Sequence, residues 1–129
     1  MTGLVLLGDE AIGQGALDAG LSGVYAYPGT PSTEITEYIQ RSKEAKERPI
    51  HTRWSANEKT AMEAGLGMSY AGKRAMVCMK HVGLNVAADA FINAAITGVN
   101  GDWWWWWRMT LRCTHPRMSR IPGTMGSLQ

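Results

Sequence analysis

Residues 74–96 read RAMVCM, KHVGLN and VAADAFINAAI in succession, and this order of segments decides the fold. The first segment is a short apolar run, which predicts a buried strand over Arg74–Met79. The second is a glycine-containing loop, and the third has the small and apolar residues of a packed helix over Val86–Ile96. A strand, a short loop and a helix in this order are the repeating unit of a parallel α/β sheet.

The same alternation runs along the rest of the chain. Short apolar runs predict three further strands, at Leu4–Leu7, Val24–Tyr27 and Ile50–Trp54. Amphipathic or small-residue segments predict three further helices, at Glu10–Ala19, Ser32–Lys46 and Asn57–Ala71. Asp9 is a candidate N-cap, and Gly20 and Gly72 are placed to end the first and third of these helices. We therefore expect an α/β fold, a parallel sheet flanked by helices.

Composition limits the classes of protein that this chain can belong to. Its 129 residues suit one domain, and no apolar run approaches the roughly 20 residues of a membrane span. The segment Met1–Gly8 has no basic start, so it does not resemble a signal peptide. Cys78 and Cys113 lack the spacing of a metal site. We expect a reduced, cytoplasmic protein with no membrane or nucleic-acid partner.

Three loops carry the candidate site. They are Tyr27–Ser32 (YPGTPS), Trp54–Lys59 (WSANEK) and Met79–Asn85 (MKHVGLN). Together they resemble the alpha subunits of indolepyruvate ferredoxin oxidoreductases, and the resemblance runs from Val5 to Gly101. Pyruvate-specific relatives share the first loop but differ at residues 80–85. The resemblance implies a thiamine-diphosphate-binding fold of the pyrimidine-gripping type.

Glu58 has the most defined chemical role that the resemblance implies. A carboxyl group at this place hydrogen-bonds N1′ of the thiamine aminopyrimidine and so promotes loss of the thiazolium C2 proton. Glu58 would then be both catalytic and cofactor-binding. The residues alone favour another role, because Ser55-x-x-Glu58 fits a capping box in which the carboxylate serves only the helix.

The other candidate residues also have two interpretations each. By resemblance, Thr30 points at the substrate carboxylate, but before Pro31 it could instead be a helix N-cap. Pro28 and Gly29 would shape the loop around the cofactor, although Gly29 also suits a simple turn. His81 follows a predicted strand, where open α/β sheets bind ligands, and could contact the substrate or be structural.

The resemblance implies oxidative decarboxylation of arylpyruvates with coenzyme A, which gives an aryl-acetyl-CoA and reduced ferredoxin. It implies thiamine diphosphate with Mg²⁺, [4Fe-4S] clusters, a beta subunit and ferredoxin. The cluster ligands are absent, since the sequence contains no C-x-x-C, so we expect this chain alone to be inactive. Two alternatives are a fragment specific for pyruvate or another 2-oxoacid, and a non-catalytic module whose tryptophans bind sugars or membranes.

The tail from Trp103 differs in character from the preceding sequence. Residues 1–102 hold all eleven acidic side chains, whereas four of the thirteen basic ones follow. Tryptophan has the single codon TGG, so the neighbouring frame over Trp103–Trp107 reads Leu-Val-Val-Val-Val, a typical buried strand. With permitted codon choices it continues ADDPSMHSSQNEQDSR, as in the family. We infer a one-base frame error at or just before Asp102. Residues 1–102 would then be an incomplete pyrimidine-binding domain and 103–129 an aberrant tail. Without the valine strand, the sheet would end in an exposed apolar edge, which the five tryptophans in its place could partly cover.

Overall fold

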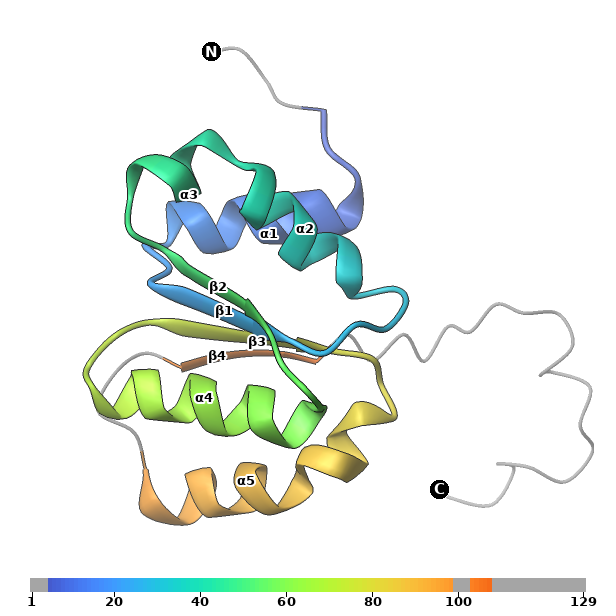
Figure 1. Cartoon of the computed structure of the whole chain (residues 1–129), viewed down its shortest axis with the longest axis vertical. Coiled ribbons are helices and arrows are strands. Elements are labelled where there is room, and N and C mark those ends of the chain that lie inside the picture. The colour runs from blue at the N-terminus through green and yellow to red at the C-terminus, as the bar shows by residue number, and fades with distance from the viewer. Residues whose placement is uncertain (1–4, 99–102, 108–129) are drawn as a thin grey trace, which may run out of the picture.

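A computed structural model of the chain describes residues 5–98 and the backbone of residues 103–107 (Figure 1). Its centre is one parallel sheet with the strand order β2-β1-β3-β4. The strands are β1 (Gly23–Ala26), β2 (His51–Trp54), β3 (Ala75–Met79) and β4 (Trp103–Trp107). The prediction of a parallel α/β sheet is therefore confirmed, and β1 and β3 lie at its middle.

Helices cover both faces of the sheet (Figure 1). One face carries α1 (Gly8–Asp18), α2 (Thr33–Arg41) and the short α3 (Lys43–Glu47). The other face carries α4 (Glu58–Tyr70) and α5 (Gly83–Thr97). In the described residues, no helix has the length and apolar character needed to cross a membrane.

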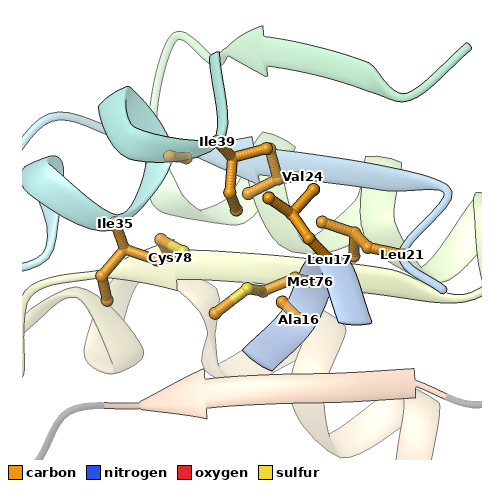
Figure 2. Close-up of a cluster of buried hydrophobic side chains, with 9 residues drawn as sticks. Ala16, Leu17, Leu21, Val24, Ile35, Ile39, Met76 and Cys78 are labelled. Atoms are coloured by element: carbon orange, nitrogen blue, oxygen red, sulfur yellow. The ribbon is translucent and has the colours of Figure 1, made fainter. Parts of the chain in front are cut away.

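The alternation of side chains along β1 and β3 divides the core into two clusters. Val24, Ala26, Met76 and Cys78 face α1 and α2, where Leu17, Ile35 and Ile39 are fully buried (Figure 2). Tyr25, Val77 and Met79 face the opposite layer and pack on α4 and α5. Both central strands are buried along their whole length, which explains their continuous apolar sequences.

Two predicted elements differ from the structure. Residues 5–7 of the predicted strand Leu4–Leu7 do not pair with the sheet, and Val5 is fully exposed. The Leu7 N–H instead donates to the Glu10 carboxylate at 2.9 Å, so α1 begins at Gly8 and Asp9 is not its cap. The predicted helix Ser32–Lys46 is two helices, because Ser42 is extended and caps α3 by accepting from the Ala45 N–H at 3.0 Å.

The sheet edge beyond β3 is not left exposed, because the tryptophan run covers it. The backbone of residues 103–107 forms β4, which pairs in parallel with β3 over its full length, from Ala75↔Trp103 to Met79↔Trp107. A strand thus stands where the alternation of the chain calls for one. Backbone pairing does not depend on side-chain identity, so a five-residue run of bulky residues can fill the place of a valine strand.

Candidate functional site

The three candidate loops meet at one edge of the sheet. Each follows the carboxyl end of a strand, and in a parallel sheet these ends lie together. Hydrogen bonds tie the loops to the neighbouring strands, since the Ser55 N–H donates to the Ala26 carbonyl at 2.7 Å and the Tyr27 N–H donates to that of Cys78 at 3.4 Å. The site is therefore assembled by strand pairing from segments far apart in the sequence.

Glu58 is the buried acid of this edge. It is the first residue of α4, and only 4% of its surface is exposed. The capping box is made by other residues: the Thr60 N–H donates to Asn57 Oδ1 at 2.9 Å, and the Asn57 N–H donates to Thr60 Oγ1 at 3.2 Å. The interpretation of Ser55 and Glu58 as a capping box is thus wrong, and the Glu58 carboxylate is not used by the helix.

The Glu58 side chain lies against Gly83, the first residue of α5. A methyl group at Gly83 would stand 2.7 Å from Glu58 Cγ and 2.9 Å from Oε1, closer than non-bonded atoms tolerate. The carboxylate therefore lies beside the first residues of two helices, a position that favours negative charge. Within residues 5–98, the carboxylate has no hydrogen-bond or ion-pair partner.

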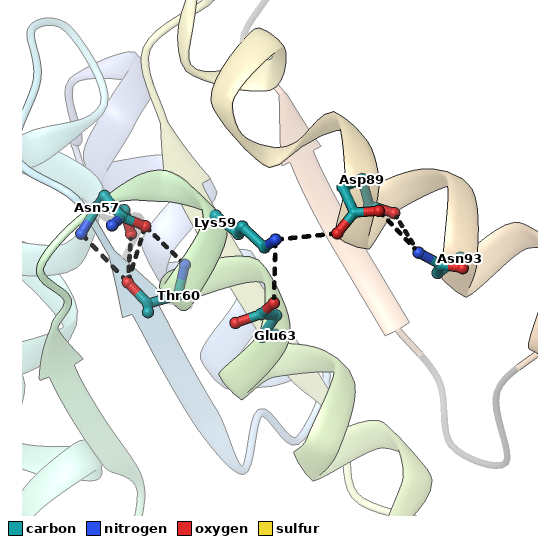
Figure 3. A network of polar contacts seen from close by, with 6 residues as sticks. All are labelled: Asn57, Lys59, Thr60, Glu63, Asp89 and Asn93. Carbon is teal, nitrogen blue, oxygen red and sulfur yellow. Dashed lines mark hydrogen bonds and ion pairs between the residues drawn. The ribbon is translucent and has the colours of Figure 1, made fainter.

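Polar contacts also join the two helices at their surface (Figure 3). Lys59, the residue after Glu58, forms an ion pair with Asp89 of α5 at 3.0 Å, and its second partner is Glu63 at 3.9 Å. Asn93 donates to the Asp89 side chain at 3.1 Å and keeps that carboxylate oriented. These exposed pairs contribute little energy each, so the two helices are held together mainly by their buried contacts, which include Ala61 of α4 and Ala87 and Ala90 of α5.

The YPGTPS loop packs on the loop that follows β3. Gly29 lies so close to the Lys80 side chain that an added Cβ would be 3.1 Å from Lys80 Cδ. The Gly29 N–H donates to Thr33 Oγ1 at 2.9 Å and its carbonyl accepts from Ser32 Oγ at 3.0 Å. Thr30 is exposed, and α2 begins only at Thr33. The alternative of Thr30 as a helix cap is therefore wrong, and its hydroxyl is left for another use.

The structure joins the candidate residues in two contacts, Glu58 with Gly83 and Gly29 with Lys80. Pro28, Thr30 and His81 lie exposed in the loops of the same edge. Sequence reasoning assigned no role to Gly83, because it placed residues 81–85 in a loop, whereas α5 begins at Gly83. Glycine is a poor helix former, so a glycine at the first position of a helix suggests that a larger side chain does not fit there. The sequence offered no other sign of a role for Gly83.

The described thiol takes no part in this site. Cys78 is free and fully buried in the centre of the sheet, and burial raises the pKa of its thiol to about 12. A thiol with such a pKa is almost entirely protonated at neutral pH and unreactive. In the described segments, no three His, Cys, Asp or Glu side chains gather as metal ligands would. The candidate groups at this edge are the Glu58 carboxylate, the Thr30 hydroxyl, the His81 imidazole and the backbone of the loops.

A protein-family model and similar curated proteins point to the same family. Residues 14–99 match the family model described as pyruvate flavodoxin/ferredoxin oxidoreductase, thiamine diP-binding. An indolepyruvate oxidoreductase subunit IorA from Pyrococcus horikoshii is 48% identical over 98 residues, which are 76% of this chain and 15% of that protein. The same subunit from Archaeoglobus fulgidus is 50% identical over 99 residues, 74% of this chain and 16% of the relative.

A solved structure agrees with these sequence matches. The 2-oxoglutarate:ferredoxin oxidoreductase from Magnetococcus marinus, with 2-oxoglutarate, coenzyme A and succinyl-CoA bound, superposes with a TM-score of 0.56 and 31% identity. The superposition covers 64% of this chain and 14% of that one. The chain spans about 15% of the length of the curated relatives it matches. It belongs to the thiamine-diphosphate-binding family of the pyruvate flavodoxin/ferredoxin oxidoreductases.

Proposed function

We propose that this chain supplies the pyrimidine-binding part of an indolepyruvate:ferredoxin oxidoreductase. The observation that carries the proposal is Glu58, a buried carboxylate without a partner in residues 5–98 at the ligand-binding edge of a parallel sheet. In the described residues, the fully buried side-chain atoms without a hydrogen bond belong to Thr36 and Arg48, so the Glu58 oxygens keep access to the surface of this edge. They are therefore available to bond a ligand there. Thiamine diphosphate, through its aminopyrimidine nitrogen, would be such a ligand.

Bound thiamine diphosphate would supply a carbon nucleophile for attack on the 2-oxoacid carbonyl. Glu58 would hold a proton at N1′ of its pyrimidine, and the two helix ends next to it would stabilise the charge when that proton shifts. Pro28 and Gly29 would shape the loop beside the cofactor. The exposed hydroxyl of Thr30 and the imidazole of His81 would bind the substrate carboxylate.

The overall reaction would convert an arylpyruvate anion, coenzyme A and two oxidised ferredoxins to an aryl-acetyl-CoA, carbon dioxide, two reduced ferredoxins and one proton. The indole preference is supported by the names of the relatives at 44–50% identity. Mg²⁺ and [4Fe-4S] clusters would bind outside residues 5–98, because that part of the chain holds no suitable group of ligands. A beta subunit, ferredoxin and coenzyme A are the proposed partners.

We also propose that the natural frame continues differently after residue 102. In support, the family match ends at Val99, and the net charge changes from −2 to +4 between residues 1–102 and the tail. The valine strand of the shifted frame would occupy the position of β4. Resequencing the locus should show one base missing or added at or just before the Asp102 codon. A confirmed read of the present frame would reject this proposal.

Turnover measurements test the function itself. We expect the shifted-frame alpha subunit, assembled with its beta subunit and thiamine diphosphate, to reduce ferredoxin with indolepyruvate and coenzyme A. Its kcat/KM for indolepyruvate should exceed that for pyruvate or 2-oxoglutarate by about 100-fold. The 129-residue chain alone should show no turnover. Activity of the isolated chain, or a preference for 2-oxoglutarate, would contradict the proposal.

A further inference from the structure

A groove between α4 and the edge strand β2 contains Arg53, a residue that the proposed reaction does not use. It has a volume of about 700 Å³. Its lining is formed by Tyr25, His51, Arg53, Trp54, Ser55, Ala56, Thr60 and Ala64. Volumes of this size accommodate small organic ligands. Glu58 and Gly83 are not in the lining, so the groove borders the candidate site through residues 54–56 of the WSANEK loop but does not include the Glu58 carboxylate.

The polar groups of the groove converge because of strand register. Tyr25 of β1 pairs with Arg53 of β2, so both side chains project from the same face of the sheet. His51 lies two residues before Arg53 and therefore projects to that face as well, where its ring is 5.4 Å from the Tyr25 ring. The small side chain of Ala64, on α4 opposite, leaves the space between helix and strand open.

The charge of the groove is entirely positive. None of the lining residues is acidic, and no carboxylate in residues 5–98 forms an ion pair with Arg53. Tyr25 is 7% exposed, and its hydroxyl has no hydrogen-bond partner in the same part of the chain. Burial raises the pKa of the Tyr25 phenol, with Arg53 acting in the opposite direction, so the hydroxyl remains a donor at neutral pH. Both groups can donate, and neither has an acceptor.

We propose that this groove binds a small organic anion, in which a carboxylate or phosphate group meets Arg53 and the Tyr25 hydroxyl and a planar apolar body lies along the aromatic side chains. A guanidinium binds both kinds of oxyanion with paired hydrogen bonds. The apolar body is required because the groove is much larger than an oxyanion and is bordered by the Tyr25 and His51 rings and by Ala64. The proposal does not rest on the oxidoreductase function, since it needs neither thiamine diphosphate nor Glu58.

Binding is tested on the 129-residue chain by NMR titration. Phenyl phosphate and phenylacetate are the two probes, and they separate a phosphate-bearing ligand from a carboxylate-bearing one. Phenol and inorganic phosphate are the controls, because phenol provides the aromatic ring without the anion and phosphate provides the anion without the ring. We expect at least one aryl anion to saturate below about 10 mM, with the largest amide shifts at Tyr25, Arg53 and Thr60, and to bind about tenfold more tightly than either half-probe.

Variants identify the groups responsible. R53Q should weaken binding of the preferred anion about tenfold or more, and Y25F should weaken it about threefold. R41Q is the matched control, because Arg41 is an exposed arginine on α2, away from the groove, and its loss should leave the affinity unchanged. Equal binding by R53Q and the unaltered chain, equal binding of phenol, or no saturable binding of either anion would overturn the proposal. Melting temperatures check that each variant is folded.

Discussion

E58Q is expected to remove most of the turnover of the assembled enzyme while leaving the domain folded. Glutamine keeps the shape of the side chain but cannot hold the acidic proton at N1′, so kcat/KM should fall by about 10²- to 10⁴-fold. In the 129-residue chain, the free energy of unfolding should change by less than about 1 kcal/mol, since within residues 5–98 the carboxylate makes no hydrogen bond or ion pair that the substitution would remove. Ferredoxin reduction and urea denaturation measure the two quantities.

Two control variants separate this role from a structural one. Glu63 lies on the same helix, but it is exposed, and its one ion pair is a long surface pair with Lys59 at 3.9 Å. E63Q should therefore keep turnover within about twofold of that of the unaltered enzyme. Asn57 makes the helix cap, and N57A should cost about 1 kcal/mol of stability. If E58Q destabilised the chain as much as N57A does, Glu58 would be a capping residue and the catalytic assignment would fail.

Most of the fold could be predicted because the central strands are buried on both faces. Runs such as Ala75–Met79 have the continuous apolar pattern expected of a strand covered on both faces, and a βα alternation leaves few other architectures. The N-terminal run could not be judged in the same way. Apolar character predicts burial, but residues 5–7 find no strand to pair with, and the capping of α1 by Glu10 takes up the Leu7 N–H.

The candidate site was predictable in its residues more than in their contacts. Glu58 was singled out by the family resemblance, whereas the residues alone favoured a capping role for it. Its helix is instead capped by Asn57 and Thr60, which local patterns did not single out. The contact with Gly83 joins residues 25 positions apart and depends on how α4 and α5 pack. The Arg53 groove is also invisible in the sequence, because it arises from the register of β1 and β2.

G83A is expected to displace Glu58. The new methyl group would lie 2.7 Å from Glu58 Cγ and 2.9 Å from Oε1, so either the carboxylate or the start of α5 must move. Overpacking of this kind should lower the free energy of unfolding of the 129-residue chain by about 1–3 kcal/mol. In the assembled enzyme, a shift of the carboxylate by about an ångström should lower kcat/KM by about 10²-fold.

The cause of this loss can be isolated by removing the atoms that the methyl group meets. In an E58A background the Cγ, Cδ and Oε1 atoms of residue 58 are absent. G83A should then no longer destabilise the chain, and its effect should be neutral or stabilising. G67A is the matched glycine control: Gly67 is exposed on α4 with open space around it, and alanine there should add about 0.5–1 kcal/mol. A G83A penalty that persisted in E58A would mean that the added methyl group disturbs the backbone of α5, and Gly83 would then have no positioning role toward Glu58. Loss of the penalty would show that the absence of a side chain at residue 83 is what gives Glu58 its place.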